Sequence, residues 1–194
     1  ENFDLVVTVD CSDRQRLGNA LEVTTQPDIN IDHHPTNTNF ARYNWVDPKA
    51  VATAEMLSEL LEYCQMPLTR QVADALLFGI ITDTLGFRTQ NMTPQALRIA
   101  ADLMEAGGNL PDLYSRGLLS RSYEAARYWG AGLTGLNRAG RLIWTSLTQK
   151  ARQAVGYRGR DDADLISVLS TVEDSDVAVV FTEQANGNVK VSWR

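Results

Sequence analysis

The segment Ile29-Asn30-Ile31-Asp32-His33-His34-Pro35 is the part of the sequence that decides the fold and the place of function. A short apolar run leads there into a carboxylate and two adjacent imidazoles. Both histidines of the 194 residues lie in this segment. Because imidazole exchanges protons near neutral pH and binds metal ions readily, we expect a functional site at this point.

Composition and charge limit the classes of protein to be considered. Hydrophobic residues make up 44% of the chain and charged residues 22%, as in ordinary globular proteins. No apolar run approaches the roughly 18 residues that cross a bilayer, so no membrane contact is expected. The net charge of -6 disfavours duplex DNA as a partner, since duplex binding requires an extended basic surface.

The two cysteines, Cys11 and Cys64, match neither a metal-binding spacing nor the disulfide framework of a small secreted protein. A cytoplasmic protein is therefore expected. The chain opens at Glu1 directly before a strand pattern and closes on another at residues 189–194. Both ends are interpreted as cuts in a longer protein.

Three short runs predict an α/β fold with a parallel sheet. Residues 5–9 and 28–31 are predicted strands, and residues 44–46 form a third. Asp10 and Asp32 fall at the carboxyl ends of the first two. Because ligands bind at that edge of open parallel sheets, the two carboxylates are expected to lie close together.

A third carboxylate follows a very apolar helix. Helical periodicity begins at Val51 and ends before Pro67, and Thr69 is predicted to cap the next helix. That helix is apolar almost all round and leads directly into Asp83. Because an unpaired buried charge is costly, Asp83 should have a metal ion or a hydrogen-bond network as its partner.

The second half of the chain has a different pattern. Thr93-Pro94 predicts the start of a helix that ends at Gly107-Gly108, and residues 110–136 predict one or two more. Strands and helices then alternate up to Asn186-Gly187, which is a strong hairpin signal. The predicted division is a first domain at residues 1–107, a helical linker at 108–139, and the start of a second α/β domain at 140–194.

The candidate site is therefore the set Asp10, Asp32, His33 and Asp83. Three carboxylates and one imidazole suit Mn²⁺ or Mg²⁺ better than Zn²⁺, whose structural sites prefer sulfur and nitrogen. Two such ions could activate a water molecule and neutralise a phosphoryl group. His34 would remain free to contact the substrate or to act as an acid.

Three motifs in this order are similar to those of a known superfamily. They are Val9-Asp10 with Asp13, then Ile31-Asp32-His33-His34-Pro35, then Gly79-Ile80-Ile81-Thr82-Asp83-Thr84 with Gly86-Phe87-Arg88. They resemble motifs two, three and four of the Asp-His-His (DHH) phosphoesterases. The resemblance is strongest to nanoRNases, or oligoribonucleases, which also remove the 3'-phosphate of adenosine 3',5'-bisphosphate.

The resemblance implies a Rossmann-like, mostly parallel sheet flanked by helices, and a companion C-terminal (DHHA1-like) domain that begins in residues 140–194. It also implies roles for the matched residues. Asp10 would bridge two Mn²⁺ ions, with Mg²⁺ as the alternative, and His33 and Asp83 would complete one of them. Asp32 would orient His33, and His34 would contact the scissile phosphate.

Some residues have simpler interpretations beside these roles. Arg88 is a candidate substrate contact because guanidinium suits phosphate, and a surface role is an equally good alternative. Asp13 is better explained as a helix cap than as a metal ligand. The aromatic side chains of the second half are better explained by packing than by base stacking: Tyr123, Tyr128, Trp129 and Trp144.

The implied function is manganese-dependent hydrolysis of short oligoribonucleotides, of the 3'-phosphate of adenosine 3',5'-bisphosphate, or of both. A cyclic-dinucleotide phosphodiesterase or a single-strand exonuclease of the same superfamily is the alternative, and a non-catalytic nucleotide-binding module is the alternative of another class. The family's first metal motif and its glycine-rich substrate motif are absent from these residues. Little activity is therefore expected from this segment alone, and a homodimer is left open.

Overall fold

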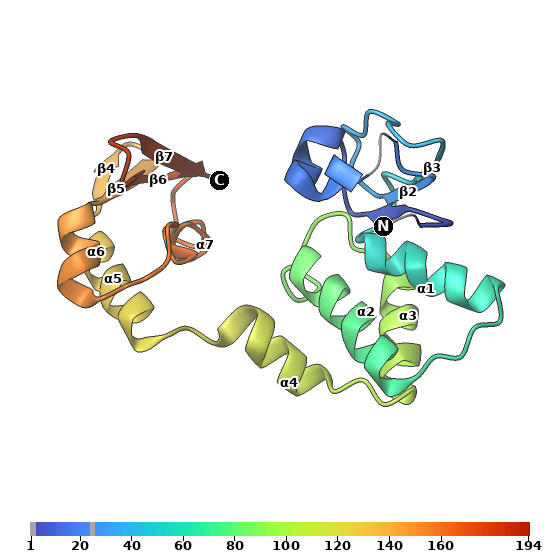
Figure 1. Ribbon diagram of the computed structural model, residues 1–194. Coiled ribbons are helices and arrows are strands. Elements are labelled where there is room, and N and C mark those ends of the chain that lie inside the picture. Colours follow the sequence, from blue (N-terminus) through green and yellow to red (C-terminus); the bar gives the residue numbers. More distant parts are fainter. Residues whose placement is uncertain (1–2, 24–25) are drawn as a thin grey trace. The chain divides into compact units, whose positions relative to one another are not determined.

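The structure is a computed structural model that describes residues 3–23 and 26–194, with the side chains of residues 3–18 and 26–194. The chain forms two compact units, Glu1–Ser120 and Arg121–Arg194. Each unit has a sheet and helices of its own (Figure 1). The α/β class expected from the sequence is confirmed. In the described parts of the chain, no helix is both long and apolar enough to span a membrane.

The first unit contains a three-stranded parallel sheet. Its strands β1 (Val7–Val9), β2 (Ile29–Asp32) and β3 (Tyr43–Val46) lie in that order, with Val7 opposite Ile29 and Ile29 opposite Tyr43. The 3₁₀-helical segment η1 (Arg14–Val23) lies between β1 and β2 in the chain. Because the strands are parallel, their carboxyl ends lie at one edge of the sheet.

The two faces of this sheet differ in polarity. Ile31 packs with Ala50 and Met56 in a small apolar core on one face. Figure 1 shows the helices α1 (Thr53–Tyr63), α2 (Arg70–Asp83) and α3 (Pro94–Glu105) together on one side of the sheet. Because successive side chains of β2 point to opposite faces of the sheet, the buried polar side chains of Asn30 and Asp32 lie on the other face.

Helix α2 is the centre of the first unit. Leu77, Ile80 and Ile81 are completely buried, as its apolar sequence predicted. The Thr69 hydroxyl accepts a hydrogen bond from the Val72 N–H and so caps α2 as expected. Thr93 caps α3 in the same way. The short helix α4 (Leu110–Tyr114) and the π-helical turn η2 (Ser115–Leu119) follow.

The second unit contains a four-stranded mixed sheet with helices against one face. Its strands lie in the order β4 (Asn137–Ala139), β5 (Leu142–Leu147), β6 (Val177–Glu183) and β7 (Val189–Trp193), and only β5 and β6 pair in parallel. The hairpin predicted at Asn186-Gly187 is confirmed, and Gly187 adopts the positive φ of 80° that its turn requires. The helices, in chain order, are α5 (Tyr123–Thr134), α6 (Gln149–Val155) and α7 (Leu165–Leu169).

The boundary between the units differs from the prediction. A linker was expected at residues 108–139, but the structure divides that segment at Ser120. Leu113 of α4 is buried in the first core, whereas Ala125 and Tyr128 of α5 are buried in the second with Ile143. Helix α5 is therefore part of the second unit, because its apolar side chains fill the core beneath the β5–β6 pair.

Two glycines of α5 provide a test of this packing. A Cβ at the buried Gly132 would lie 2.5 Å from Leu165 Cδ2 and 3.1 Å from Leu147 Cδ2, whereas a Cβ at the exposed Gly130 would meet nothing within 4 Å. We expect Gly132→Ala to destabilise the second unit by about 1–3 kcal/mol through overpacking. Gly130→Ala should stabilise it by roughly 1 kcal/mol through helix propensity.

Urea unfolding followed by tryptophan fluorescence measures both effects, because Trp129 and Trp144 belong to this unit. Equal effects of the two substitutions would contradict the packing of α5 described above.

Candidate metal centre

Asp10 stands directly after β1, at the carboxyl edge of the first sheet. Its N–H donates to the Ile31 carbonyl at 3.0 Å, which continues the pairing of β1 with β2. Its φ of 56° lies in the left-handed region, which aspartate tolerates better than most residues. The Asp10 side chain is half exposed, and its Oδ1 accepts a hydrogen bond from the Thr53 hydroxyl at 3.0 Å. The carboxylate is thereby held at the sheet edge.

His33 faces the Asp10 carboxylate with one ring nitrogen and the protein backbone with the other. Its Nδ1 lies 3.2 Å from the Ala50 carbonyl oxygen, which can only accept a hydrogen bond. Nδ1 therefore carries the proton in the neutral ring. Nε2 is left with a free lone pair, 3.6 Å from Asp10 Oδ1 and 3.6 Å from Asp83 Oδ2.

Asp83 brings the second carboxylate to His33 from the last residue of α2. Partial burial and the nearby Asp10 carboxylate raise the pKa of Asp83, and the two histidines only partly oppose this effect. The following residue, Thr84, is fully buried. Its hydroxyl donates to the Ile80 carbonyl at 2.6 Å and accepts from the Phe87 N–H at 2.9 Å. These bonds hold the chain in place directly after Asp83.

The sequence predicts that Asp32 orients His33, and this prediction is wrong. Asp32 is completely buried, and its Oδ1 lies 2.7 Å from Nδ1 of His34. Its Oδ2 accepts a hydrogen bond from the Asn37 side-chain amide at 2.5 Å. Burial raises the pKa of Asp32, but the hydrogen bonds from His34 and Asn37 outweigh burial, so the net shift is downward. Asp32 is therefore a buried carboxylate that orients His34.

The structure thus brings together four of the residues singled out in the sequence. Ligand atoms of Asp10, His33 and His34 lie within 4.8 Å of one another. Asp83 joins them through its 3.6 Å approach to His33. His33 Nε2 lies 3.6 Å from an oxygen of each of Asp10 and Asp83, whereas His34 Nδ1 lies 2.7 Å from Asp32 Oδ1 and 3.8 Å from Asp10 Oδ1.

This set of side chains fits a divalent cation. Two carboxylate oxygens and one imidazole lone pair converge, and among the described residues no Lys or Arg forms an ion pair with either carboxylate. A cation bound there would relieve the repulsion between Asp10 and Asp83. The contact from the Ala50 carbonyl to Nδ1 is the support that metal-binding histidines usually have. Asp10, His33 and Asp83 could therefore hold a metal ion.

Several supporting residues were not found from the sequence. Thr53 is buried at the start of α1 and holds Asp10. Asn37 holds Asp32 and also donates to the Cys11 carbonyl at 3.1 Å. Asn30 is completely buried and accepts from the Thr8 hydroxyl. For Asn30 and Asn37 the available signal was a polar residue within or after a predicted strand, and for Thr53 it was a polar residue in the first turn of a predicted helix.

The remaining sequence candidates are arranged more simply. Arg88 is exposed, and its Nε donates to the Leu85 carbonyl at 3.1 Å. Asp13 caps η1 as expected, since its Oδ1 accepts from the Gln15 and Arg16 N–H groups. Cys11 is buried, and burial raises the pKa of its thiol. A buried thiol with a raised pKa is a packing residue rather than a nucleophile.

Comparison with known proteins gives a family match in the first unit. Residues 2–80 match the model of the DHH family, N-terminal domain. The chain is 36% identical over 168 residues to the bifunctional oligoribonuclease and PAP phosphatase NrnA of Thermus thermophilus. This match covers 86% of this chain and 50% of that protein. A probable NrnA of Streptococcus mutans is 27% identical and covers 98% of this chain and 61% of its own length. The chain therefore spans about half the length of the curated relatives it matches.

Solved structures show the same fold. An exopolyphosphatase-related protein from Bacteroides fragilis superposes with a TM-score of 0.87 at 20% identity, covering 98% of this chain and 58% of that chain. A putative family II inorganic pyrophosphatase from Methanococcus jannaschii superposes with a TM-score of 0.54 at 18% identity, covering 96% of this chain and 67% of that chain. The similarity extends over both units.

Substitution of Asn37 tests the support of Asp32. Asn37→Ala removes one of the hydrogen bonds that lower the Asp32 pKa, so that pKa should rise and stability at neutral pH should fall by about 1–3 kcal/mol. A carboxylate with a lowered pKa contributes stability above its ordinary range, near 3.9, and loses it as pH falls through its folded pKa. The difference between the two proteins should therefore shrink in acid.

Urea unfolding at a series of pH values measures this difference. A constant difference between pH 7 and the acid range would show that Asn37 does not act through the Asp32 carboxylate.

Proposed function

We propose that this chain, whose residues 2–80 match the model of the DHH family N-terminal domain, is part of a manganese-dependent phosphoesterase. Its substrates would be short oligoribonucleotides, the 3'-phosphate of adenosine 3',5'-bisphosphate, or both. The observation that carries the proposal is the convergence of Asp10 and Asp83 on the lone pair of His33 Nε2. The names of the matched relatives support the choice of substrates.

Asp10, His33 and Asp83 would hold one metal ion in this proposal. Two oxygens and one nitrogen suit Mn²⁺, and Mg²⁺ is the alternative ion. A bound metal supplies a Lewis acid that lowers the pKa of its water and neutralises phosphoryl charge. Thr53 keeps Asp10 in place, and the Ala50 carbonyl keeps the lone pair of His33 directed at the two carboxylates.

His34 is proposed to contact the scissile phosphate. Its Nδ1 faces the buried Asp32 carboxylate, so its Nε2 remains available for a phosphate oxygen. Asp32 is held from its other side by Asn37, which fixes the orientation of the His34 ring. Asp32 therefore acts as a positioning residue in the proposed reaction. Arg88, whose side chain is exposed in the segment after Asp83, is retained as a candidate substrate contact.

The electrostatics of the site explain why a metal ion is needed. Asp10, Asp32 and Asp83 lie within one small region, and their charges would repel a phosphate group. Phosphate could approach only after a cation had neutralised part of this charge.

The proposal of a cytoplasmic location rests on the cysteine usage described above.

Metal binding by this chain tests the proposed ligands directly. Isothermal titration with Mn²⁺ should show saturable binding, and Asp10→Asn should weaken it by about tenfold or more, because one anionic ligand is removed. Asp13→Asn is the matched control, since Asp13 lies three residues away and caps η1. Equal Mn²⁺ affinity in wild type and Asp10→Asn would overturn the ligand assignment.

Hydrolysis tests the proposed reaction, and it is best measured on the protein encoded by the whole gene. We expect Mn²⁺-dependent release of mononucleotides from the dinucleotide pApA, of phosphate from adenosine 3',5'-bisphosphate, or of both. His34→Ala should reduce kcat by about 10²-fold or more while Mn²⁺ affinity changes little. Hydrolysis that persists in excess EDTA would contradict the proposal. Cleavage of a cyclic dinucleotide in place of both substrates would favour the alternative within the superfamily.

A further inference from the structure

A groove on the second unit is lined by positively charged side chains, all of them distant in sequence from the residues of the metal centre. Arg152 of α6, Arg160 of the loop before α7 and Lys190 of β7 line a cavity of about 400 Å³. Three side-chain amides complete its polar wall: Gln184, Asn186 and Asn188. None of the described residues that line this cavity is acidic. We call it the hairpin groove, because the turn between β6 and β7 forms one of its sides.

The cations of the hairpin groove are not neutralised by carboxylates. Among the residues whose side chains are described, neither Arg160 nor Lys190 has an acidic oxygen within 4.0 Å. The nearby carboxylates have other partners: Glu183 accepts the Gln149 N–H at 2.8 Å, and Asp161 accepts the Tyr157 hydroxyl at 2.6 Å. Lys190 influences Asp161 only at longer range. The groove therefore holds excess positive charge in a chain whose net charge is -6.

Arg152 is held in place before any ligand binds. Its Nη2 donates to the Glu183 carbonyl at 3.2 Å, and its guanidinium carbon lies 5.8 Å from the centre of the Tyr128 ring. Its Nε and the Tyr128 hydroxyl are both buried, and the two side chains interact, since Arg152 opposes the rise in the Tyr128 pKa that burial causes. The Arg152 guanidinium is therefore held by groups of the second unit itself.

The amides of the groove are also fixed by the fold. Gln184 donates from Nε2 to the Arg160 carbonyl at 3.1 Å, which ties the loop that carries Arg160 to the hairpin. The Asn188 N–H donates to Asn186 Oδ1 at 3.1 Å, and the Gln184 N–H donates to the Asn188 carbonyl at 2.8 Å. The three cations are therefore brought together by elements that hydrogen-bond to one another.

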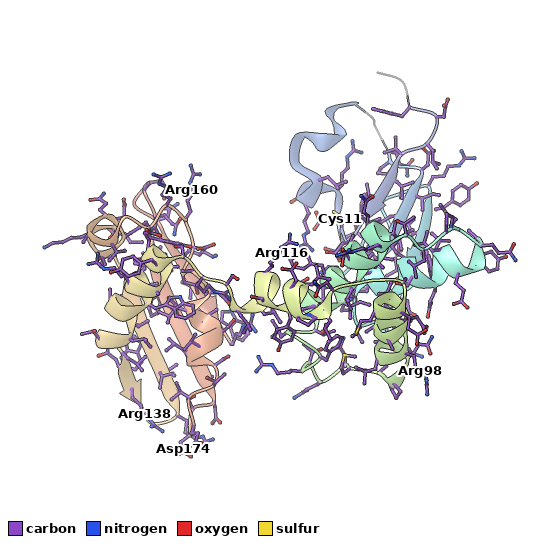
Figure 2. All side chains as sticks on the ribbon, turned by 90° about the horizontal axis from the view of Figure 1, so that it is seen from below. Cys11, Arg98, Arg116, Arg138, Arg160 and Asp174 are labelled. Carbon is purple, nitrogen blue, oxygen red and sulfur yellow. The ribbon has the colours of Figure 1, made fainter. Side chains whose placement is uncertain are left out.

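We propose that the hairpin groove binds the phosphate group of a small phosphate-bearing ligand. Two guanidinium groups and one ammonium group match the charge and the several acceptor oxygens of phosphate, and the volume suits a ligand of nucleotide size. Figure 2 shows Arg160 at the end of the second unit opposite Arg138 and Asp174, so the groove is separate from the end of the sheet where Arg138 donates to the Asp174 carbonyl. The proposal is independent of the metal centre, since every residue of the groove belongs to the second unit.

Nuclear magnetic resonance titration of the 194-residue chain tests this site. The probes are inorganic phosphate, pyrophosphate and AMP, all with EDTA present so that the metal centre is excluded. We expect saturable shifts of the amide signals of residues 184–190 and of the Arg152 Nε–H signal. Tighter binding of AMP than of inorganic phosphate would identify a nucleotide ligand, and tighter binding of pyrophosphate would identify an inorganic polyanion.

Paired variants of equal charge separate a site from a general charge effect. Arg160→Gln with Lys190→Gln removes two groove cations and should weaken binding by about tenfold or more. Arg127→Gln with Lys150→Gln removes two exposed cations of the same unit that do not line the groove, and it should change binding less than about twofold. All four side chains are exposed, and circular dichroism checks that each variant folds.

Absence of saturable shifts at residues 184–190 up to 10 mM of every probe, a limit of roughly 3 kcal/mol in binding free energy, would overturn the proposal. Equal weakening in the two paired variants would overturn it as well, because binding would then depend on net charge alone. Neither outcome depends on metal binding or on hydrolysis, so the proposed function is tested separately.

Discussion

The contact between His33 Nδ1 and the Ala50 carbonyl is the interaction on which the metal centre depends. It fixes the tautomer of the ring, so that the free lone pair faces Asp10 and Asp83. Ala50 is itself held by a tight turn before α1. Its N–H donates to the Asp47 carbonyl, and the next N–H, that of Val51, donates to the buried Glu55 carboxylate at 2.6 Å. Thr53, which holds Asp10, is the first residue of the helix that follows this turn. One short segment thus supports two of the three proposed ligands.

Much of the candidate site could be predicted from the sequence, because the carboxyl edge of a parallel sheet brings together residues that are distant in the chain. Asp10 and His33 converge for that reason, and Asp83 reaches them from the end of the apolar helix α2. The partner of Asp32 was predicted wrongly, although strand alternation contains the answer. Side chains two residues apart in an extended chain lie on the same side, so Asp32 is placed to meet His34 rather than His33. The partner of His33 is a backbone carbonyl, which no side-chain pattern indicates.

The division into two units could not be read from local patterns. The apolar face of α5 predicts a helix that packs on something, but periodicity does not say on which core. Tyr128 and Ala125 lie against Ile143 and neighbouring side chains of the second sheet, which come later in the chain. The close approach of Gly132 to Leu165 depends on the same tertiary packing. Such contacts join segments far apart in the sequence, so they become visible only when the fold is known.

The two units differ in the charge that they present to a phosphate group. Residues 1–120 contain sixteen Asp and Glu against eight Lys and Arg, whereas residues 121–194 contain eight against ten. The acidic unit directs three carboxylates toward one edge of its sheet and so needs a cation before an anionic substrate can approach. The hairpin groove of the second unit presents its own cations and needs none. The net charge of -6 conceals this difference, because it sums the whole chain, whereas recognition depends on where the charges lie.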